Sequence, residues 1–119
     1  RAAMGSEGED LAMTDKVIVY TSCRDAAEAE KLARHLVERR LAASVSIVPA
    51  VRSFYRWKGD IQDEQELLLM IKASRGSLTT LRREIEKLHS YDLPQLVAIP
   101  IVDGSPNYLA WLERELAAS

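Results

Sequence analysis

One stretch, residues 44–74, constrains the fold more than any other part of the chain. Residues 44–56 are rich in Val, Ile, Phe and Tyr, the residue types that suit a pleated strand. Residues 57–60 then supply a turn in which Gly59 can adopt a positive φ, and residues 61–73 are extended again. Two such runs of about 13 residues predict one β-hairpin, whose arms would reach about 43 Å, well beyond an ordinary strand.

The rest of the chain alternates between strands and helices. Hydrophobic spacing and capping residues predict five further elements: a strand over 16–22, helices over 25–40 and 77–89, a strand over 95–102 and a helix over 107–117. The resulting order, β-α-β-β-α-β plus a terminal helix, predicts an α+β fold of the ferredoxin-like type, with an antiparallel sheet and both covering helices on one face. We expect one domain over residues 16–119, preceded by a disordered leader over residues 1–15.

Each predicted helix has an apolar stripe and a polar side. In the first helix the stripe consists of Ala29, Leu32, Ala33, Leu36 and Val37. Asp25 and Glu28 have the spacing of a capping box, and Glu28 is expected to point outward. In the last helix the residues expected to be buried are Tyr108, Leu109, Trp111, Leu112 and Leu116.

The second arm of the hairpin is apolar on both of its faces. Because side chains alternate along a strand, residues 67–71 divide between the faces, with Leu67, Leu69 and Ile71 on one and Leu68 and Met70 on the other. Two helices can cover only one face, and the arms carry Phe54, Tyr55 and Trp57 beyond the helices. An exposed apolar surface of this kind is a liability in a monomer, so we expect an oligomer with these three aromatic residues at its interface.

Composition excludes several classes of protein. The chain has 119 residues, of which 47% are hydrophobic, and this is enough for one core. Its 16 basic and 18 acidic residues lack the basic excess of nucleic-acid-binding proteins, and no apolar run approaches the roughly 18–20 residues that cross a bilayer. We therefore expect neither nucleic acid nor membrane as a partner. The single cysteine excludes an internal disulfide and suits the cytoplasm.

The sequence contains no catalytic constellation, which predicts that the protein is not an enzyme. It has no phosphate-binding glycine-rich loop, no nucleophile elbow and no closely spaced pair of His or Cys ligands. With one cysteine and two histidines, a closed soft-ligand metal site inside a single chain is nearly excluded. The candidates for function are therefore individual side chains.

His89 and Cys23 are the candidate soft ligands. His89 comes at the end of the second helix, where it can be a metal ligand or simply a cation at a helix C-terminus. Cys23 follows the first strand, close to the N-terminal end of a helix that would favour its thiolate. The alternative for Cys23 is a small side chain that fills space in the core.

A second group of candidates lies on and beside the hairpin. Glu64 and Glu66 share a strand face with Lys72 by their spacing. They can bind a hard cation, shape a pocket with Lys72, or form an ion-pair ladder that is exposed or lies between subunits. The aromatic residues near them, Trp57, Tyr55 and Tyr91, suit either interface packing or the wall of a ligand cage.

Four stretches of the chain resemble one family. They are TSCRDAAEAEKLARHLVERRLAASVSIVP, SFYRWKGDIQDEQELLLMIKAS, HSYDLPQLVAIPI and NYLAWL, and together they resemble the CutA divalent-cation-tolerance family over residues 16–116. The resemblance implies a ferredoxin-like subunit, a tight homotrimer joined by extended strands, and a link to tolerance of copper and other divalent metals. It also suggests the architecture of the P-II signalling trimers, which bind small ligands in clefts between subunits.

On this resemblance we expect a cytoplasmic homotrimer that takes part in the response to metal ions and needs no organic cofactor. It would bind Cu²⁺, another divalent cation or a small anion in clefts between subunits through Glu66, Lys72, His89 and Tyr91. Two alternatives remain open: a P-II-like sensor of a small anionic metabolite, and a structural trimer that scaffolds other proteins. Ser44 stands where many members of the family have a cysteine.

Overall fold

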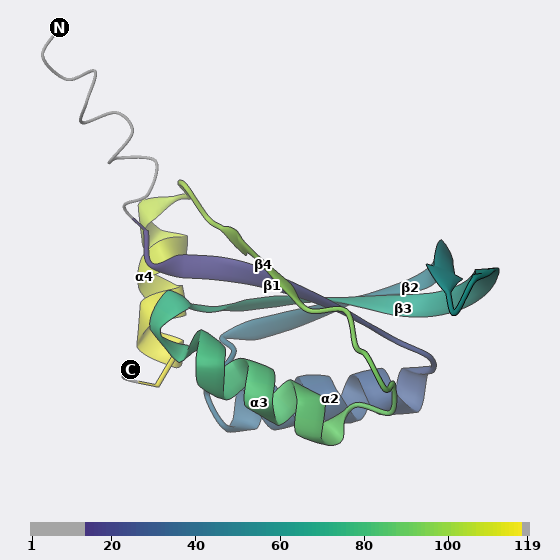
Figure 1. Cartoon of the computed structure of the whole chain (residues 1–119). Coiled ribbons are helices and arrows are strands. Elements are labelled where there is room, and N and C mark those ends of the chain that lie inside the picture. The colour runs from purple at the N-terminus through teal and green to yellow at the C-terminus, as the bar shows by residue number, and fades with distance from the viewer. Residues whose placement is uncertain (1–13, 118–119) are drawn as a thin grey trace, which may run out of the picture.

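Four strands, three α-helices and a short 3-10 helix make up residues 14–117, the part of the chain that the computed structural model describes (Figure 1). In chain order the elements are β1 (Lys16–Cys23), α2 (Ala26–Glu38), β2 (Ser44–Trp57), β3 (Asp60–Ser74), η1 (Arg75–Ser77), α3 (Leu78–Leu88), β4 (Val97–Pro100) and α4 (Pro106–Glu115). The fold is α+β, as predicted. Residues 1–13 of the predicted leader lie outside the described part, and its last two residues, Thr14 and Asp15, already hydrogen-bond to Ile101 and Arg75.

Strand β1 lies in the middle of an antiparallel sheet with the strand order β2-β3-β1-β4. Its residues Val17 and Val19 are buried in the core, whereas Ile18 and Tyr20 on its other face are only partly buried. Strand β4 pairs only with β1 and has four residues, so the prediction of a strand over 95–102 is too long at both ends. It ends at Pro100 because proline has no amide hydrogen to donate to a ladder.

Helices α2 and α3 cover the same face of the sheet (Figure 1). Asp25 caps α2, since its carboxylate accepts a hydrogen bond from the Glu28 amide at 2.8 Å. The core between the helices and the sheet includes Leu32, Leu36, Leu69, Ile71, Leu81 and Ile85. Val37 was predicted to join this core, but it is 42% exposed because it lies one helical step beyond Leu36, at the margin of the contact.

Helix α4 lies across one end of the sheet (Figure 1) and forms a smaller core of its own. Leu112 and Leu116 are buried there with Ala43. The prediction that Tyr108 is buried is wrong, because the residue is 41% exposed and its ring stacks on the ring of Trp111, with centroids 5.7 Å apart. This helix thus closes the sheet at the end opposite the hairpin turn.

The hairpin has the length that the sequence predicts. Strands β2 and β3 contain 14 and 15 residues, and they extend beyond the helices to make the molecule 52 Å long (Figure 1). Lys58 and Gly59 form the turn with φ values of 50° and 88°. Two successive positive φ values are typical of a tight hairpin turn, which glycine adopts without a steric cost.

A β-bulge divides the hairpin and was not predicted. The register with β3 shifts between Val48 and Val51, where Ala50 adopts a φ of 59°. The extra residue reverses which side chains of β2 face each side of the sheet. As a result, Val48, Tyr55 and Trp57 all lie on the face that α2 and α3 leave uncovered.

That uncovered face is partly apolar, as the sequence predicts. Leu68 and Met70 are half-buried on it, and the neighbouring edge strand exposes Val97 and Ile99 to 48% and 46%. No helix among residues 14–117 is both long and apolar enough to cross a membrane. The open face and the projecting hairpin are the main exposed apolar surfaces of the described chain.

Candidate functional site

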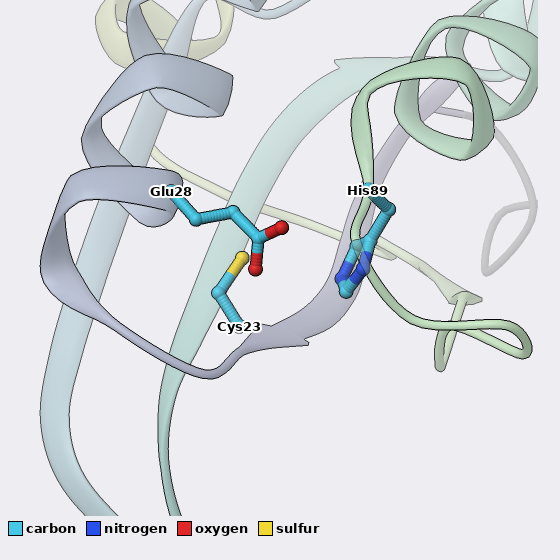
Figure 2. Close-up of side chains that lie close together, drawn as sticks. All are labelled: Cys23, Glu28 and His89. Carbon is cyan, nitrogen blue, oxygen red and sulfur yellow. The ribbon is translucent and has the colours of Figure 1, made fainter.

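Cys23, Glu28 and His89 approach one another at the end of β1 (Figure 2). Cys23 is the last residue of β1, Glu28 lies in the first turn of α2, and His89 directly follows α3. One ligand atom from each side chain lies within 4.8 Å of the other two. The structure therefore brings together both of the predicted soft ligands, and it adds a carboxylate to them.

Glu28 turns back over the end of β1, although the sequence predicts that it points outward. Its Oε2 accepts a hydrogen bond from the Ser90 amide at 2.8 Å, and its Oε1 is buried without a partner among residues 14–117. The capping-box spacing explains this position, because an acidic side chain there reaches back toward the start of the helix. A buried carboxylate oxygen without a donor is unfavourable, and a cation would relieve the cost.

Both ring nitrogens of His89 have hydrogen-bond partners. The Tyr91 amide donates to Nδ1 at 3.1 Å, so the ring proton lies on Nε2, which donates to the Ser22 carbonyl at 2.7 Å. These two bonds fix the ring beside Cys23 and Glu28 (Figure 2). A metal ion could bind His89 only by replacing one of them.

The thiol of Cys23 is fully buried. Burial, followed by the negative charges of Glu28, Asp25 and Glu66, raises the pKa of Cys23 to about 12. The sequence predicts that the start of a helix favours the thiolate, but burial outweighs this effect. At neutral pH the group is therefore a thiol, which is not a metal ligand until it loses its proton.

The donor set of this cluster fits a borderline divalent ion such as Zn²⁺ or Cu²⁺. Sulfur, imidazole nitrogen and carboxylate oxygen are all ligands for these ions, and three protein ligands leave further positions open. The unpartnered Oε1 of Glu28 is the observation that favours such an ion. The buried thiol and the bonded imidazole mean that the site would form upon binding, with the release of a proton.

A cleft of about 990 Å³ lies on the uncovered side of the sheet. Its walls are the projecting hairpin and residues 90–97, the segment that connects α3 to β4. The lining includes six residues that the sequence singles out, which are Phe54, Tyr55, Trp57, Glu64, Glu66 and Tyr91. The bulge in β2 is the reason that Tyr55 and Trp57 face the same side as the two carboxylates.

Glu66 is the most buried acidic group of the cleft, with 7% of the residue exposed. Its Oε2 accepts hydrogen bonds from the Tyr91 hydroxyl at 2.7 Å and from the Ser22 hydroxyl at 3.2 Å. Burial, followed by the bond to Glu66, raises the pKa of Tyr91 above its usual range. The neighbouring Glu64 accepts a hydrogen bond from Tyr55, and this bond raises the pKa of that phenol as well.

One other predicted site residue, Lys72, lies away from these groups within the chain. Lys72 pairs with Ile18 and Ser44, and it lies six positions along β3 from Glu66, a distance of about 20 Å. The chain therefore does not place Lys72 in a pocket with Glu66. Phe54 also contributes to the cleft lining, although its pairing with Asp63 places it on the other face of the hairpin from Tyr55. The guanidinium carbon of Arg52 lies 5.0 Å from its ring centroid.

Several residues of the two groups are not evident from the sequence. Glu28 carries a signal in its capping-box spacing, which places it near the end of the preceding strand. Ser22 hydrogen-bonds to Glu66 and Ser90 to Glu28, and each pair is far apart in the sequence. No local sequence pattern therefore identifies either serine. The side on which Tyr55 lies depends on the bulge, which only the register between β2 and β3 defines.

The fold and these two groups of side chains define a small α+β protein with a candidate metal cluster and a separate cleft. Residues 17–115 match the family described as CutA1 divalent ion tolerance protein, and the chain belongs to this family. The names of the family and of its Thermus thermophilus member describe a tolerance protein and not an enzyme.

Individual relatives agree with this assignment. The divalent-cation tolerance protein CutA of Thermus thermophilus is 45% identical over 86 residues, which are 72% of this chain and 84% of that protein. The chloroplastic CutA protein of Arabidopsis thaliana is 39% identical over 82% of this chain, which spans only 54% of the plant protein. A solved structure of the Thermus thermophilus protein, described as divalent cation tolerance protein (Cut A1), superimposes with a TM-score of 0.83 at 38% identity, covering 86% of this chain and 99% of that one.

Proposed function

We propose that the protein binds Cu²⁺ or another divalent cation through Cys23, Glu28 and His89, and that it thereby takes part in the response to metal ions. The observation that supports this most directly is the approach of three ligand atoms within 4.8 Å of one another. Membership of a divalent ion tolerance family agrees with it. Glu64 and Glu66, which the sequence also suggests as metal ligands, are engaged by tyrosine hydroxyls in the cleft.

The thiol gives this proposal a specific pH dependence. Because the pKa of Cys23 is about 12, binding through sulfur at neutral pH must release one proton. The affinity should therefore rise by about tenfold for each pH unit between pH 7 and 8.5. Stronger binding at higher pH is expected because each unit makes the loss of the thiol proton easier.

Calorimetry with Zn²⁺ and with Cu²⁺ on the full chain tests the site. We expect one ion per chain, a loss of at least about tenfold in affinity for His89→Ala, and a weaker pH dependence for Cys23→Ser. The matched control is His35→Ala, since the ring of His35 lies 2.9 Å from Glu84 and away from the cluster. An unchanged affinity in His89→Ala would remove His89 as a ligand and contradict the proposal.

We also propose that the chain forms a homotrimer with a ferredoxin-like, P-II-like architecture and acts in the cytoplasm. The sheet order β2-β3-β1-β4 with both helices on one face supports the first part, and the exposed apolar residues of the hairpin support association. The single free cysteine agrees with a reducing compartment. Light scattering should return about 40 kDa, three times the chain mass of 13.3 kDa, and a 13.3 kDa species would contradict the trimer.

A further inference from the structure

Tyr91 connects the candidate metal cluster to the cleft through two hydrogen bonds. Its amide donates to Nδ1 of His89 at 3.1 Å, and its hydroxyl donates to Glu66 at 2.7 Å. The rings of His89 and Tyr91 also lie against each other, with centroids 4.8 Å apart. The cluster adjoins the core beneath the helices, to which Cys23 belongs (Figure 2), whereas Glu66 lines the cleft on the uncovered side of the sheet. One residue therefore contacts both groups of side chains.

Coordination of a metal ion by His89 is incompatible with the hydrogen bond from the Tyr91 amide. A neutral imidazole has one nitrogen with a free lone pair and one nitrogen with a proton, and coordination uses the lone pair. If Nδ1 coordinates the ion, its lone pair can no longer accept the Tyr91 amide. If Nε2 coordinates the ion, the ring proton must move to Nδ1, which again can no longer accept. The bond from the Tyr91 amide is lost in both cases.

The hydroxyl bond of Tyr91 opposes the adjustment that must follow. Tyr91 is half-buried, and a backbone amide that loses its acceptor is unfavourable until it reaches water or another acceptor. The backbone at residue 91 must therefore shift. The bond to the Glu66 carboxylate holds the side chain of the same residue, and hydrogen bonds to charged groups are stronger than neutral ones. A shift of the Tyr91 backbone thus competes with the bond to Glu66.

We propose that metal binding at the cluster is coupled to the cleft through Tyr91, so that an occupied cluster releases the Tyr91 amide and weakens the bond between Tyr91 and Glu66. This inference rests on the proposed metal function and adds regulation to it. Residues 90–97 form one wall of the cleft and lead into β4, so the coupling carries metal binding to the uncovered face of the sheet. Because coupling between two sites is reciprocal, the bond from Tyr91 to Glu66 should in turn weaken metal binding.

Calorimetry of the full chain with Zn²⁺ tests the coupling from the side of the cleft. Tyr91→Phe removes the hydroxyl that bonds to Glu66 and keeps the ring and the amide. Its Zn²⁺ affinity should rise by about three- to tenfold, because part of a hydrogen bond to a charged group no longer opposes binding. Tyr55→Phe is the matched control, since it removes the corresponding hydroxyl bond to Glu64 in the same cleft, and Tyr55 makes no hydrogen bond to His89. It should leave Zn²⁺ affinity within about twofold.

Hydrogen exchange of single amides, followed by NMR, tests the coupling from the side of the metal. In wild type, saturating Zn²⁺ should speed the exchange of the Tyr91 amide by at least about fivefold, because this amide loses its acceptor. The internal control is the Glu28 amide, which lies at the same cluster but donates to Asp25, so its exchange should not accelerate. In the metal-free protein, His89→Ala should also speed the exchange of the Tyr91 amide, because it removes the same acceptor.

The results separate this inference from the proposed function. Suppose that Zn²⁺ binds wild type and that His89→Ala weakens it: the cluster is then supported. The coupling alone is overturned if Tyr91→Phe, folded by circular dichroism, binds Zn²⁺ no more tightly than wild type, or if the Tyr91 amide stays protected at saturating Zn²⁺. An equal gain in Tyr55→Phe would assign the effect to the charge of the cleft and also overturn the coupling. If folded wild type does not bind Zn²⁺, the proposed function and the coupling both fail.

Discussion

The two ends of strand β3 differ in what covers them, although both lie in the same hairpin. At the end covered by α2 and α3, Leu69 and Ile71 are 0% exposed. At the other end, Ile61 is 70% exposed, and Phe54 on the paired strand is 62% exposed. The comparison shows that burial against the helices supplies the stability of the sheet. The projecting end leaves large apolar side chains exposed in the single chain.

The projecting end of the hairpin, where residues 52–57 pair with residues 60–65, is held mainly by contacts between its own two strands. Arg52 and Asp63 form a two-pronged ion pair at 2.9 and 2.8 Å, and the two-residue turn fixes the register. Exposed ion pairs contribute about 0–1 kcal/mol, and an isolated two-stranded ribbon is marginally stable. We therefore expect amide exchange to be faster near the turn than in the covered half.

The largest effect is expected for a truncation in the covered half. Leu69→Ala should lower the free energy of unfolding by about 2–5 kcal/mol, because it leaves a cavity beneath α2 and α3. The matched control is Leu68→Ala, which truncates the same side chain on the uncovered face, where Leu68 is only half-buried. Urea unfolding at one protein concentration measures both variants. Equal losses of unfolding free energy in the two variants would show that Leu68 is as well buried as Leu69. The contrast between the two faces of β3 would then not hold.

Much of this contrast could be predicted from the sequence, because it depends on local patterns. Continuous Leu, Met and Ile in residues 67–71 indicate a strand that is apolar on both faces, and Gly59 marks the turn. The bulge could not be predicted, because the identities of Pro49 and Ala50 do not define the register between β2 and β3. The face on which Tyr55 lies follows from that register, so the sequence could not define the wall of the cleft.

The candidate metal cluster shows a similar limit. Cys23 and His89 were recognisable as ligand types, and each was correctly placed at the end of an element. Their approach to Glu28 depends on how α3 packs beside α2, which involves residues about 60 positions apart. The high pKa of Cys23 depends first on burial in the same packing, and its place just before α2 does not indicate that burial.

A smaller effect is expected at the start of the covering helix. Asp25→Ala should lower the free energy of unfolding by about 0.5–2 kcal/mol, because it removes the carboxylate that accepts the Glu28 amide. Ser105→Ala is the control, since Ser105 occupies the same position before α4 but makes no side-chain capping bond. Thermal unfolding of both variants compares them. A loss in Ser105→Ala as large as in Asp25→Ala would show that the cap is not the cause.

A gain in stability is expected at the bulge, where the covered and projecting halves meet. Ala50 holds a φ of 59°, a conformation that disfavours a Cβ atom by about 1–2 kcal/mol. Ala50→Gly should raise the free energy of unfolding by about 0.5–1 kcal/mol, after the greater flexibility of unfolded glycine is subtracted. Ala98→Gly, in the edge strand β4, should have the opposite sign, because Ala98 lies in regular strand structure. Destabilisation by both substitutions, measured by urea unfolding, would contradict the assignment of strain to the bulge.

The smallest effect on the isolated chain is expected at the projecting end, and it tests the comparison most directly. Phe54→Ala removes a larger side chain than Leu69→Ala, yet it should change the free energy of unfolding of a monomer by no more than about 0.5 kcal/mol, because Phe54 is already 62% exposed. Sedimentation across a range of protein concentrations, together with urea unfolding, separates two causes of a larger loss. If the loss grows with concentration, Phe54 is buried by a second copy, since association stabilises the folded state by mass action. A loss of about 2 kcal/mol in a chain that stays monomeric would show that the projecting half is itself part of the core.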